Sequence, residues 1–278
     1  MIISVASGKG GTGKTTVATN LALSIENAQF IDCDVEEPNA NVFLKAKIKD
    51  SKNVLVIVPD VDKNKCDYCG KCSEFCMYNA IAVVPSNVLV FPDLCHSCKG
   101  CELVCPRDAI NWQKRSVGKI EHGQKNGIDF YHGLLNIGEI MAIPVIKALK
   151  KLVDPAKDVI LDAPPGTSCP VIETIGGSDY CVLVTEPTAF GLHDLKLAVE
   201  VVKRLSISFG VIINCDGIGD NRVDDFCNEQ KIPILLKIPH SMEIAQLYSK
   251  GIPFIDGIPE WDKKFKDLYK TIKKEKGK

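Results

Sequence analysis

The cysteines carry the clearest chemical signal in this chain. The sequence has 278 residues and 13 cysteines, and eight of these lie between Cys66 and Cys105. One spacing occurs twice: three cysteines separated by two residues each, then a fourth after three further residues. Regularly spaced thiols indicate metal ligation, because disulfide frameworks are rare in a reducing compartment. We therefore treat these eight cysteines as candidate metal ligands.

The two cysteine runs form an internal repeat. The segment 66–81 (CDYCGKCSEFCMYNAI) matches the segment 95–110 (CHSCKGCELVCPRDAI) at a constant offset of 29 residues. The spacing resembles that of bacterial two-cluster ferredoxins, in which the fourth cysteine of each run ligates the other cluster. The resemblance implies two [4Fe–4S] clusters, one held by Cys66, Cys69, Cys72 and Cys105, and the other by Cys95, Cys98, Cys101 and Cys76.

Zinc is the alternative metal, because pairs of cysteines separated by two residues also build tetrahedral zinc sites. Each zinc ion needs four ligands, but that need does not explain why one four-cysteine spacing occurs twice. We therefore favour iron–sulfur clusters over zinc.

A glycine-rich loop near the N-terminus is the second chemical signal. Residues 8–13 (GKGGTG) fit the dinucleotide pattern G-x-G-x-x-G, and Asp32 follows at a distance typical of a ribose-binding acid. Continued through Lys14 and Thr15, the same residues fit the phosphate loop G-x-x-x-x-G-K-[ST]. A triphosphate with Mg²⁺ needs a cation and a hydroxyl ligand, which Lys14 and Thr15 supply, so we favour ATP. The predicted phosphate-binding residues are Gly10, Gly11, Thr12, Gly13, Lys14, Thr15 and Thr16.

The sequence GKGGTGKTT also carries an early lysine, Lys9. It resembles the deviant Walker A motif of the P-loop ATPase class that includes MinD, ParA, Mrp and nitrogenase iron protein. The resemblance implies a dimer, with itself or with a paralogous ATPase, in which Lys9 reaches the partner's nucleotide. In this class Asp34 matches the switch I aspartate near the attacking water. Asp162 matches the Walker B aspartate that holds Mg²⁺ through water.

The resemblance also assigns the adenine end of the site. Asn214 follows the apolar run 211–213 and matches the class's adenine-reading asparagine. Pro239 lies in a segment that resembles the C-terminal part of the class's base-binding pocket.

The remaining cysteines give weaker signals. Cys181, Cys215 and Cys227 lie in or beside apolar segments, which predicts small core residues. Cys169 follows Asp162 by seven residues, the offset at which nitrogenase iron protein carries a cluster ligand. The second ligand that such a cluster needs has no obvious match here, so we do not favour a cluster at Cys169.

The elements that must position these residues alternate between strands and helices. Apolar runs at 2–6, 159–161, 181–184 and 211–213 predict buried strands, with helices between them. This alternation predicts an α/β fold: a doubly wound parallel sheet with nucleotide at its carboxyl edge. The pattern stops between 58 and 116 and then resumes. We therefore predict a discontinuous P-loop NTPase domain, 1–57 and 117–278, and an inserted α+β ferredoxin-like domain at 58–116.

Composition limits the partners. A formal net charge of −1 gives no reason to expect nucleic acid as a ligand. No apolar run approaches the roughly 18 residues of a membrane span, and the N-terminus leaves no room for a signal peptide, so we expect a cytoplasmic protein. An apolar stripe marks a Lys-rich C-terminal segment, at Trp261, Phe265, Leu268, Tyr269 and Ile272. MinD-type ATPases use such helices on membranes, but we favour a helix packed on the core.

Three functions fit these signals. The insert lies between the two segments that match switch I and switch II, which sense the γ-phosphate. Our leading hypothesis is therefore that ATP closes the dimer and its hydrolysis gates electron transfer through the clusters to a redox partner protein. The alternative is an iron–sulfur cluster carrier of the Mrp type, although the C-terminal Cys-x-x-Cys of those proteins is absent. A positioning ATPase like ParA or MinD has no use for clusters and ranks third.

Overall fold

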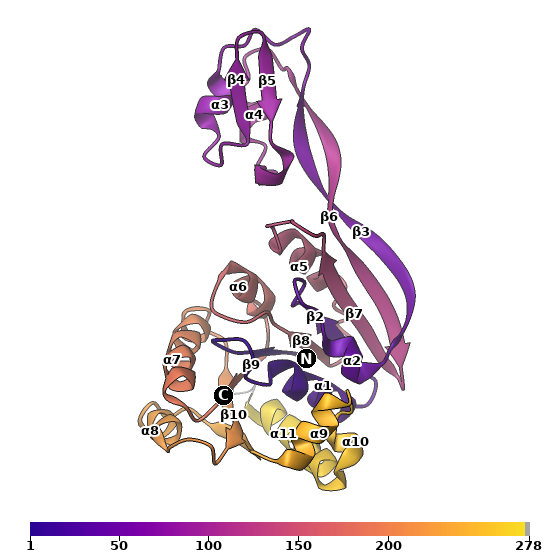
Figure 1. Ribbon diagram of the computed structural model, residues 1–278, viewed down its shortest axis with the longest axis vertical. Coiled ribbons are helices and arrows are strands. Elements are labelled where there is room, and N and C mark those ends of the chain that lie inside the picture. Colours follow the sequence, from indigo (N-terminus) through magenta and orange to yellow (C-terminus); the bar gives the residue numbers. More distant parts are fainter. Residues whose placement is uncertain (276–278) are drawn as a thin grey trace.

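The computed structural model describes residues 1–275, and these build a nine-stranded sheet with helices on both faces (Figure 1). The strands are β1 (Ile2–Ala6), β2 (Gln29–Asp32), β3 (Lys47–Val61), β6 (Ile110–Lys125), β7 (Ile128–Leu135), β8 (Val159–Asp162), β9 (Tyr180–Thr185), β10 (Phe209–Asp216) and β11 (Ile234–Pro239). Their order across the sheet is β11-β10-β9-β1-β8-β2-β7-β6-β3.

Two layers of helices cover the sheet because its strands are apolar on both faces. Along β9, Val182 and Val184 face one layer, whereas Cys181 and Leu183 face the other. The first layer consists of α1 (Lys14–Leu23), α2 (Ala40–Leu44), α10 (Phe254–Gly257) and α11 (Pro259–Glu275), with α9 (Met242–Ser249) beside them. The second consists of α5 (Ile143–Lys150), α6 (Cys169–Ile175), α7 (Ala189–Arg204) and α8 (Arg222–Glu229).

The predicted parallel sheet is correct for seven strands and wrong at one edge. From β11 to β7 every neighbouring pair is parallel, but β6 pairs antiparallel with β7 and β3 pairs antiparallel with β6. The reason is the insertion itself. Its two connecting segments pair with each other along their whole length, from Lys47 with Gln124 to Val61 with Ile110. They therefore join the sheet as a hairpin.

This hairpin leaves the sheet as a two-stranded ribbon. Strand β7 supports β6 only from Gly118 to Lys125, so residues 110–116 pair with β3 alone. The support from β7 ends at a β-bulge in β6. There Val54 pairs with Gly118 and Leu55 pairs with Ser116, so that Val117 has no partner in the register of β3. A bulge bends a strand and increases its twist, which suits the point where the ribbon turns away from the helices (Figure 1). The boundaries 58 and 116 thus lie inside continuous strands.

The cysteine module, residues 62–109, lies at the far end of the ribbon (Figure 1). It contains α3 (Lys71–Phe75), α4 (Gly100–Leu103) and a separate hairpin of β4 (Ile81–Val84) and β5 (Asn87–Val90). Its backbone repeats at the offset of 29 residues. Left-handed conformations occur in matched pairs, at Tyr68 and Ser97, Gly70 and Lys99, and Asn79 and Asp108. The sequence repeat is therefore also a structural repeat.

The C-terminal helix packs on the core, as predicted. Trp261, Phe265, Leu268 and Ile272 are buried, and Phe265 and Trp261 both contact the ring of Phe254. Within residues 1–275, no helix combines the length and the apolar character needed to cross a membrane.

We predict that the ATPase lobe folds without the cysteine module. Replacing residues 62–109 by Asn-Gly should close the ribbon with a two-residue hairpin turn between Val61 and Ile110. The midpoint of thermal unfolding should change by less than about 4 °C, a shift that corresponds to about 1 kcal/mol in a chain of this size. A control that deletes the paired strands as well, residues 47–125, should unfold far earlier because it exposes the edge of β7. A collapse of both proteins would contradict a separable module.

Candidate functional site

The predicted nucleotide residues meet at the carboxyl edge of the parallel strands. They line an open cavity, the nucleotide cavity, formed by the loop after β1, the end of β10, the end of β11 and helix α9. The predicted residues in its wall are Gly10, Gly11, Gly13, Lys14, Thr15, Thr16, Asp34, Asn214 and Pro239. This convergence follows from topology, since parallel strands bring their carboxyl ends to one side of the sheet.

The phosphate loop owes its shape to two glycines. Gly11 and Gly13 have φ values of 79° and 88°, which L-residues with a side chain rarely adopt. Asn214 also packs against Gly13, since a Cβ there would lie 2.3 Å from the Asn214 amide nitrogen. That amide donates a hydrogen bond to the Thr12 carbonyl at 2.9 Å. Asn214 therefore holds the loop in place besides lining the cavity.

Three carboxyl groups gather beneath this loop. Asp32 and Asp162 are fully buried and sit opposite each other in the register of β2 and β8. Asp32 accepts hydrogen bonds from the backbone N–H groups of Asp34 and Ala40. Among the described residues, neither oxygen of Asp162 has a hydrogen-bond partner. An unpaired buried carboxylate is costly, so Asp162 is suited to a cation or its water.

Lys14 is the cation that faces these carboxyl groups. Its side chain is 7% exposed, and its Nζ lies 4.0 Å from Asp34 Oδ2. Burial raises the pKa of Asp34 to about 6, with Lys14 opposing the shift and Asp162 adding to it. Burial also raises the pKa of Asp162, against the effect of Lys14. Three carboxyl groups thus face one lysine, and a bound divalent cation would favour their ionised forms.

Lys9 and Thr12 do not line the nucleotide cavity. The Lys9 ammonium lies 3.2 Å from Glu186 Oε2 and is one-third exposed. Thr12 is buried, and its hydroxyl has no hydrogen-bond partner among the described residues. The action of Lys9 on a partner's nucleotide stays a prediction.

Helix α9 contributes Ile244 and Ala245, which belong to the segment expected to resemble the base pocket, and Tyr248, which was not predicted. The ring of Tyr248 is tilted against that of Phe43, with centroids 5.3 Å apart. The helical spacing of Tyr248 from Ile244 and Ala245 was the available signal, because apolar and aromatic residues suit the face of a base. Cys215 also lines the cavity and is only half-buried, so its expected place in the core is wrong. Cys181 and Cys227 are fully buried, as predicted.

The eight cysteines line two separate cavities, four in each. The first cysteine site contains Cys66, Cys69, Cys72 and Cys105. The second cysteine site contains Cys76, Cys95, Cys98 and Cys101. In each set the fourth thiol comes from the other repeat. In the described part of the chain, no three His, Cys, Asp or Glu side chains approach closely enough to hold a single metal ion.

The surroundings of the thiols suit metal ligation. Backbone N–H groups donate to sulfur at 3.4 Å at matched positions, from Ala80 to Cys76 and from Ala109 to Cys105. Burial raises the pKa of Cys101 to about 11, so without metal this thiol is protonated at neutral pH. A ligating thiol is a thiolate, and metal uptake must therefore release protons. Four thiols around one partly exposed site fit a cluster, in which thiolates bind different iron atoms.

The two sites differ in the side chains beside them. At the first site, Arg107 forms an ion pair with Asp67 at 2.9 Å. The repeat places Tyr78 and His96 at the corresponding positions of the second site, and their rings stack with centroids 3.6 Å apart. The two cysteine sites are therefore chemically distinct.

The comparisons with known proteins agree with this geometry. Residues 3–254 match the family described as the CobQ/CobB/MinD/ParA nucleotide binding domain. An uncharacterized protein of Methanocaldococcus jannaschii is 33% identical over 92% of this chain and 91% of its own length. An iron–sulfur cluster carrier protein of Pyrococcus abyssi is 23% identical over 91% of this chain and 78% of its own. The cell division ATPase MinD of Pyrococcus furiosus has a similar fold, with a TM-score of 0.61, 20% identity and 98% of each chain covered.

We predict that Asp34→Asn stabilises the nucleotide-free protein at alkaline pH. The pKa of Asp34 in the folded protein, about 6, exceeds its ordinary value of 3.8, so folded Asp34 binds a proton more tightly than unfolded Asp34. Stability from this group is complete below pH 3.8 and is lost as pH rises through 6. Because asparagine has no charge, the variant should be more stable by about 1–3 kcal/mol at pH 8.

Urea unfolding at pH 5 and pH 8 measures this difference. The advantage of Asp34→Asn should shrink at pH 5, where most folded Asp34 is protonated. Asp60→Asn, at an exposed position on the ribbon, is the control and should show no such dependence. An equal effect at both pH values would contradict the raised pKa.

Proposed function

We propose a function from one premise: this chain belongs to the CobQ/CobB/MinD/ParA family of nucleotide-binding domains. The protein is an ATP-dependent iron–sulfur cluster carrier or assembly ATPase that holds clusters in its cysteine module. The observation that carries this proposal is the division of eight cysteines into two four-thiol cavities on a chain with a complete phosphate loop. The similarity to an iron–sulfur cluster carrier protein supports this proposal. It favours the carrier function over the electron-transfer hypothesis that the sequence alone put first.

In the nucleotide cavity, the loop amides and Lys14 bind the phosphates of ATP. Thr15 would hold Mg²⁺ through its hydroxyl and Asp162 would hold it through water, and the ion would neutralise charge on the phosphates. Asp34 orients the attacking water, and its raised pKa makes it able to accept a proton near neutral pH. Asn214 and Pro239 enclose the base. Two subunits close over the nucleotides, and Lys9 exchanges Glu186 for the partner's phosphate.

In the cysteine module, each four-thiol cavity holds one [4Fe–4S] cluster. The interior of the module contains few apolar side chains, and Cys95 and Cys101 are among its buried residues. A short module with so little core depends on metal for stability. Electron transfer through retained clusters is the second candidate, favoured by the N–H···S hydrogen bonds at Cys76 and Cys105. A cluster that stays bound needs ligands held in fixed positions, whereas a cluster that is transferred must be released by its ligands.

The sharing of ligands between the repeats gives a direct test of the clusters. Wild-type protein reconstituted without oxygen should bind about eight iron atoms, and Cys66→Ser or Cys105→Ser about half of these. Because Cys66 and Cys105 line the same cavity, the double variant should lose no more iron than either single variant. Cys66→Ser combined with Cys76→Ser should lose nearly all of it.

Iron and sulfide analysis with EPR gives the count. The exposed Cys169 is the control, and Cys169→Ser should keep the full iron content. Additive losses in the Cys66 and Cys105 double variant would overturn the assignment across repeats. Stoichiometric zinc in place of iron would overturn the clusters themselves.

A second test separates cluster transfer from electron transfer. If clusters are cargo, Mg-ATP should speed the loss of iron to an added chelator, measured by absorbance without oxygen. Lys14→Ala should abolish this dependence, because loss of the phosphate-binding charge costs on the order of 3 kcal/mol, about 100-fold in affinity. Asp34→Ala should still bind ATP but hydrolyse it slowly, which shows whether binding alone is sufficient.

The outcome that favours electron transfer is equally specific. The iron content would then stay constant over many ATP turnovers, while ATP changes the EPR signal or the reduction potential of the bound clusters. Wild-type turnover in both the Lys14 and Asp34 variants would contradict the nucleotide site.

A further inference from the structure

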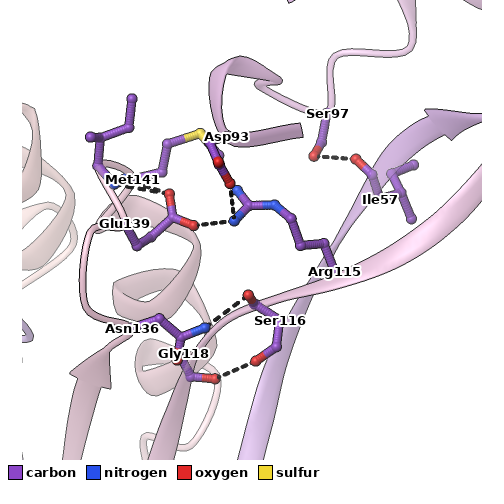
Figure 2. A network of polar contacts seen from close by, with 10 residues as sticks. Ile57, Asp93, Ser97, Arg115, Ser116, Gly118, Asn136, Glu139 and Met141 are labelled. Carbon is purple, nitrogen blue, oxygen red and sulfur yellow. Dashed lines mark hydrogen bonds and ion pairs between the residues drawn. The ribbon is translucent and has the colours of Figure 1, made fainter. Parts of the chain in front are cut away.

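A single arginine contacts both the cysteine module and the ATPase lobe. Arg115 lies on the ribbon, and its Nη1 is 3.2 Å from Asp93 in the module and 2.5 Å from Glu139 in the lobe (Figure 2). The two contacts differ in strength. Glu139 is 2% exposed, whereas Asp93 is 82% exposed. Arg115 is therefore firmly bound to the lobe and weakly bound to the module.

Glu139 sets the conformation of the loop that contains it. Its second carboxylate oxygen accepts hydrogen bonds from the backbone N–H groups of Ile140 and Met141, at 3.0 and 3.1 Å. The loop is also fastened to the ribbon, because the Asn136 amide donates to the Ser116 carbonyl at 2.9 Å (Figure 2). A shift of the Arg115 guanidinium thus acts directly on residues 136–142.

A continuous route leads from this loop to the nucleotide cavity. The loop ends at the start of α5, which packs against α6. Lys150 of α5 donates to the carbonyl oxygens of Glu173 and Gly176 at the end of α6. Helix α6 follows segment 163–168, whose Pro165 lines the nucleotide cavity. Packed helices and hydrogen bonds of this kind can carry coupling between distant sites.

On the module side, Arg115 lies near the second cysteine site. Asp93, which forms the ion pair with Arg115, precedes Cys95 by two residues. Ser97 fastens the same cysteine loop to the ribbon, through a 2.6 Å hydrogen bond to the Ile57 carbonyl (Figure 2). Two nitrogens of Arg115, Nε and Nη2, are buried without a partner among the described residues. These two N–H groups are therefore available to donate to a negatively charged group that enters nearby.

The internal repeat supplies a comparison site. An offset of 29 residues places Asn64 and Ser86 where the second site has Asp93 and Arg115, and neither residue carries a charge. The first cysteine site has an arginine of its own, Arg107, but its partner Asp67 lies within the module. The described residues therefore connect only the second site to the lobe in this way.

We propose that Arg115 couples the second cysteine site to the nucleotide cavity through Glu139, α5 and α6, and that the first site lacks this coupling. The proposal rests on the proposed function insofar as iron fills the cysteine sites. A four-thiolate cluster is negatively charged, so loading the second site draws the guanidinium toward Cys95 and away from Glu139. The loop at residues 136–142 then shifts, and the shift passes through α5 and α6 to segment 163–168 beside the nucleotide. Arg115 is a positioning residue in this scheme.

The test compares nucleotide affinity in iron-loaded and iron-free full-length protein. Mg-ADP is the probe because it allows no turnover, and calorimetry gives its affinity. Loading should change the wild-type affinity by about tenfold, within the range of measured allosteric couplings. Arg115→Met and Glu139→Gln should reduce the change to less than about twofold. Arg107→Met, the matched control at the first site, should keep it.

Amide hydrogen exchange gives a readout that a purely structural role would not produce. Iron loading should change exchange at Ile140 and Met141 in the wild type and in Arg107→Met, but not in Arg115→Met. Arg115→Lys keeps the charge and should partly restore the response. If Arg115→Met does not fold, Glu139→Gln decides the question, because it keeps the shape of the side chain.

The failures of the two proposals can be told apart. A wild type that binds iron and Mg-ADP, but with equal ADP affinity in both states, overturns the coupling and leaves the proposed function intact. Equal loss of coupling in Arg107→Met and Arg115→Met also overturns it. A wild type that takes up no iron overturns the proposed function itself.

Discussion

One ammonium group among three carboxyl groups determines how this sheet must be assembled. Lys14 faces Asp34 across 4.0 Å, above the buried Asp32 and Asp162. Buried charges are tolerated only when paired or hydrogen-bonded, so β1, β2 and β8 must end at the same level. The helices on both faces keep these strand ends in register. When the phosphates of a nucleotide bind, Lys14 would pair with them instead of with Asp34. The carboxyl groups would then need a metal ion as their counter-charge.

The architecture separates the two chemistries. The cysteine module is joined to the lobe by two antiparallel strands and by the contacts of Arg115 and Ser97. A ribbon without neighbouring strands bends more easily than a sheet supported on both sides. Bending of this ribbon would move the cysteine sites without disturbing the strands that carry the phosphate loop. In the coupling proposed above, Arg115 and its buried partner Glu139 transmit a change at the cysteine module to the lobe.

Site residues could be predicted from the sequence where they belong to one short motif. The phosphate loop is one continuous motif and the cysteine sets follow one spacing, so the sequence named most of the residues that line the nucleotide cavity and all eight cysteines that line the two cysteine sites. The antiparallel edge was not, because 47–61 and 110–125 pair only through a hairpin closed by the whole module. Arg115 and Glu139 belong to no motif and lie in segments that meet only after folding. Cys215 was misplaced because an apolar run does not show which end of its strand opens into a cavity.

The outermost strand, β3, leaves one edge of the sheet without a partner. Such an edge invites pairing with another molecule and aggregation. Its residues 47–53 are KIKDSKN, all exposed, and three of them are lysines. Charged side chains on an edge strand oppose this pairing, because a second copy would bring like charges together. The hairpin thus extends the sheet by two strands, and the composition of the outer one opposes edge-to-edge pairing with a second copy.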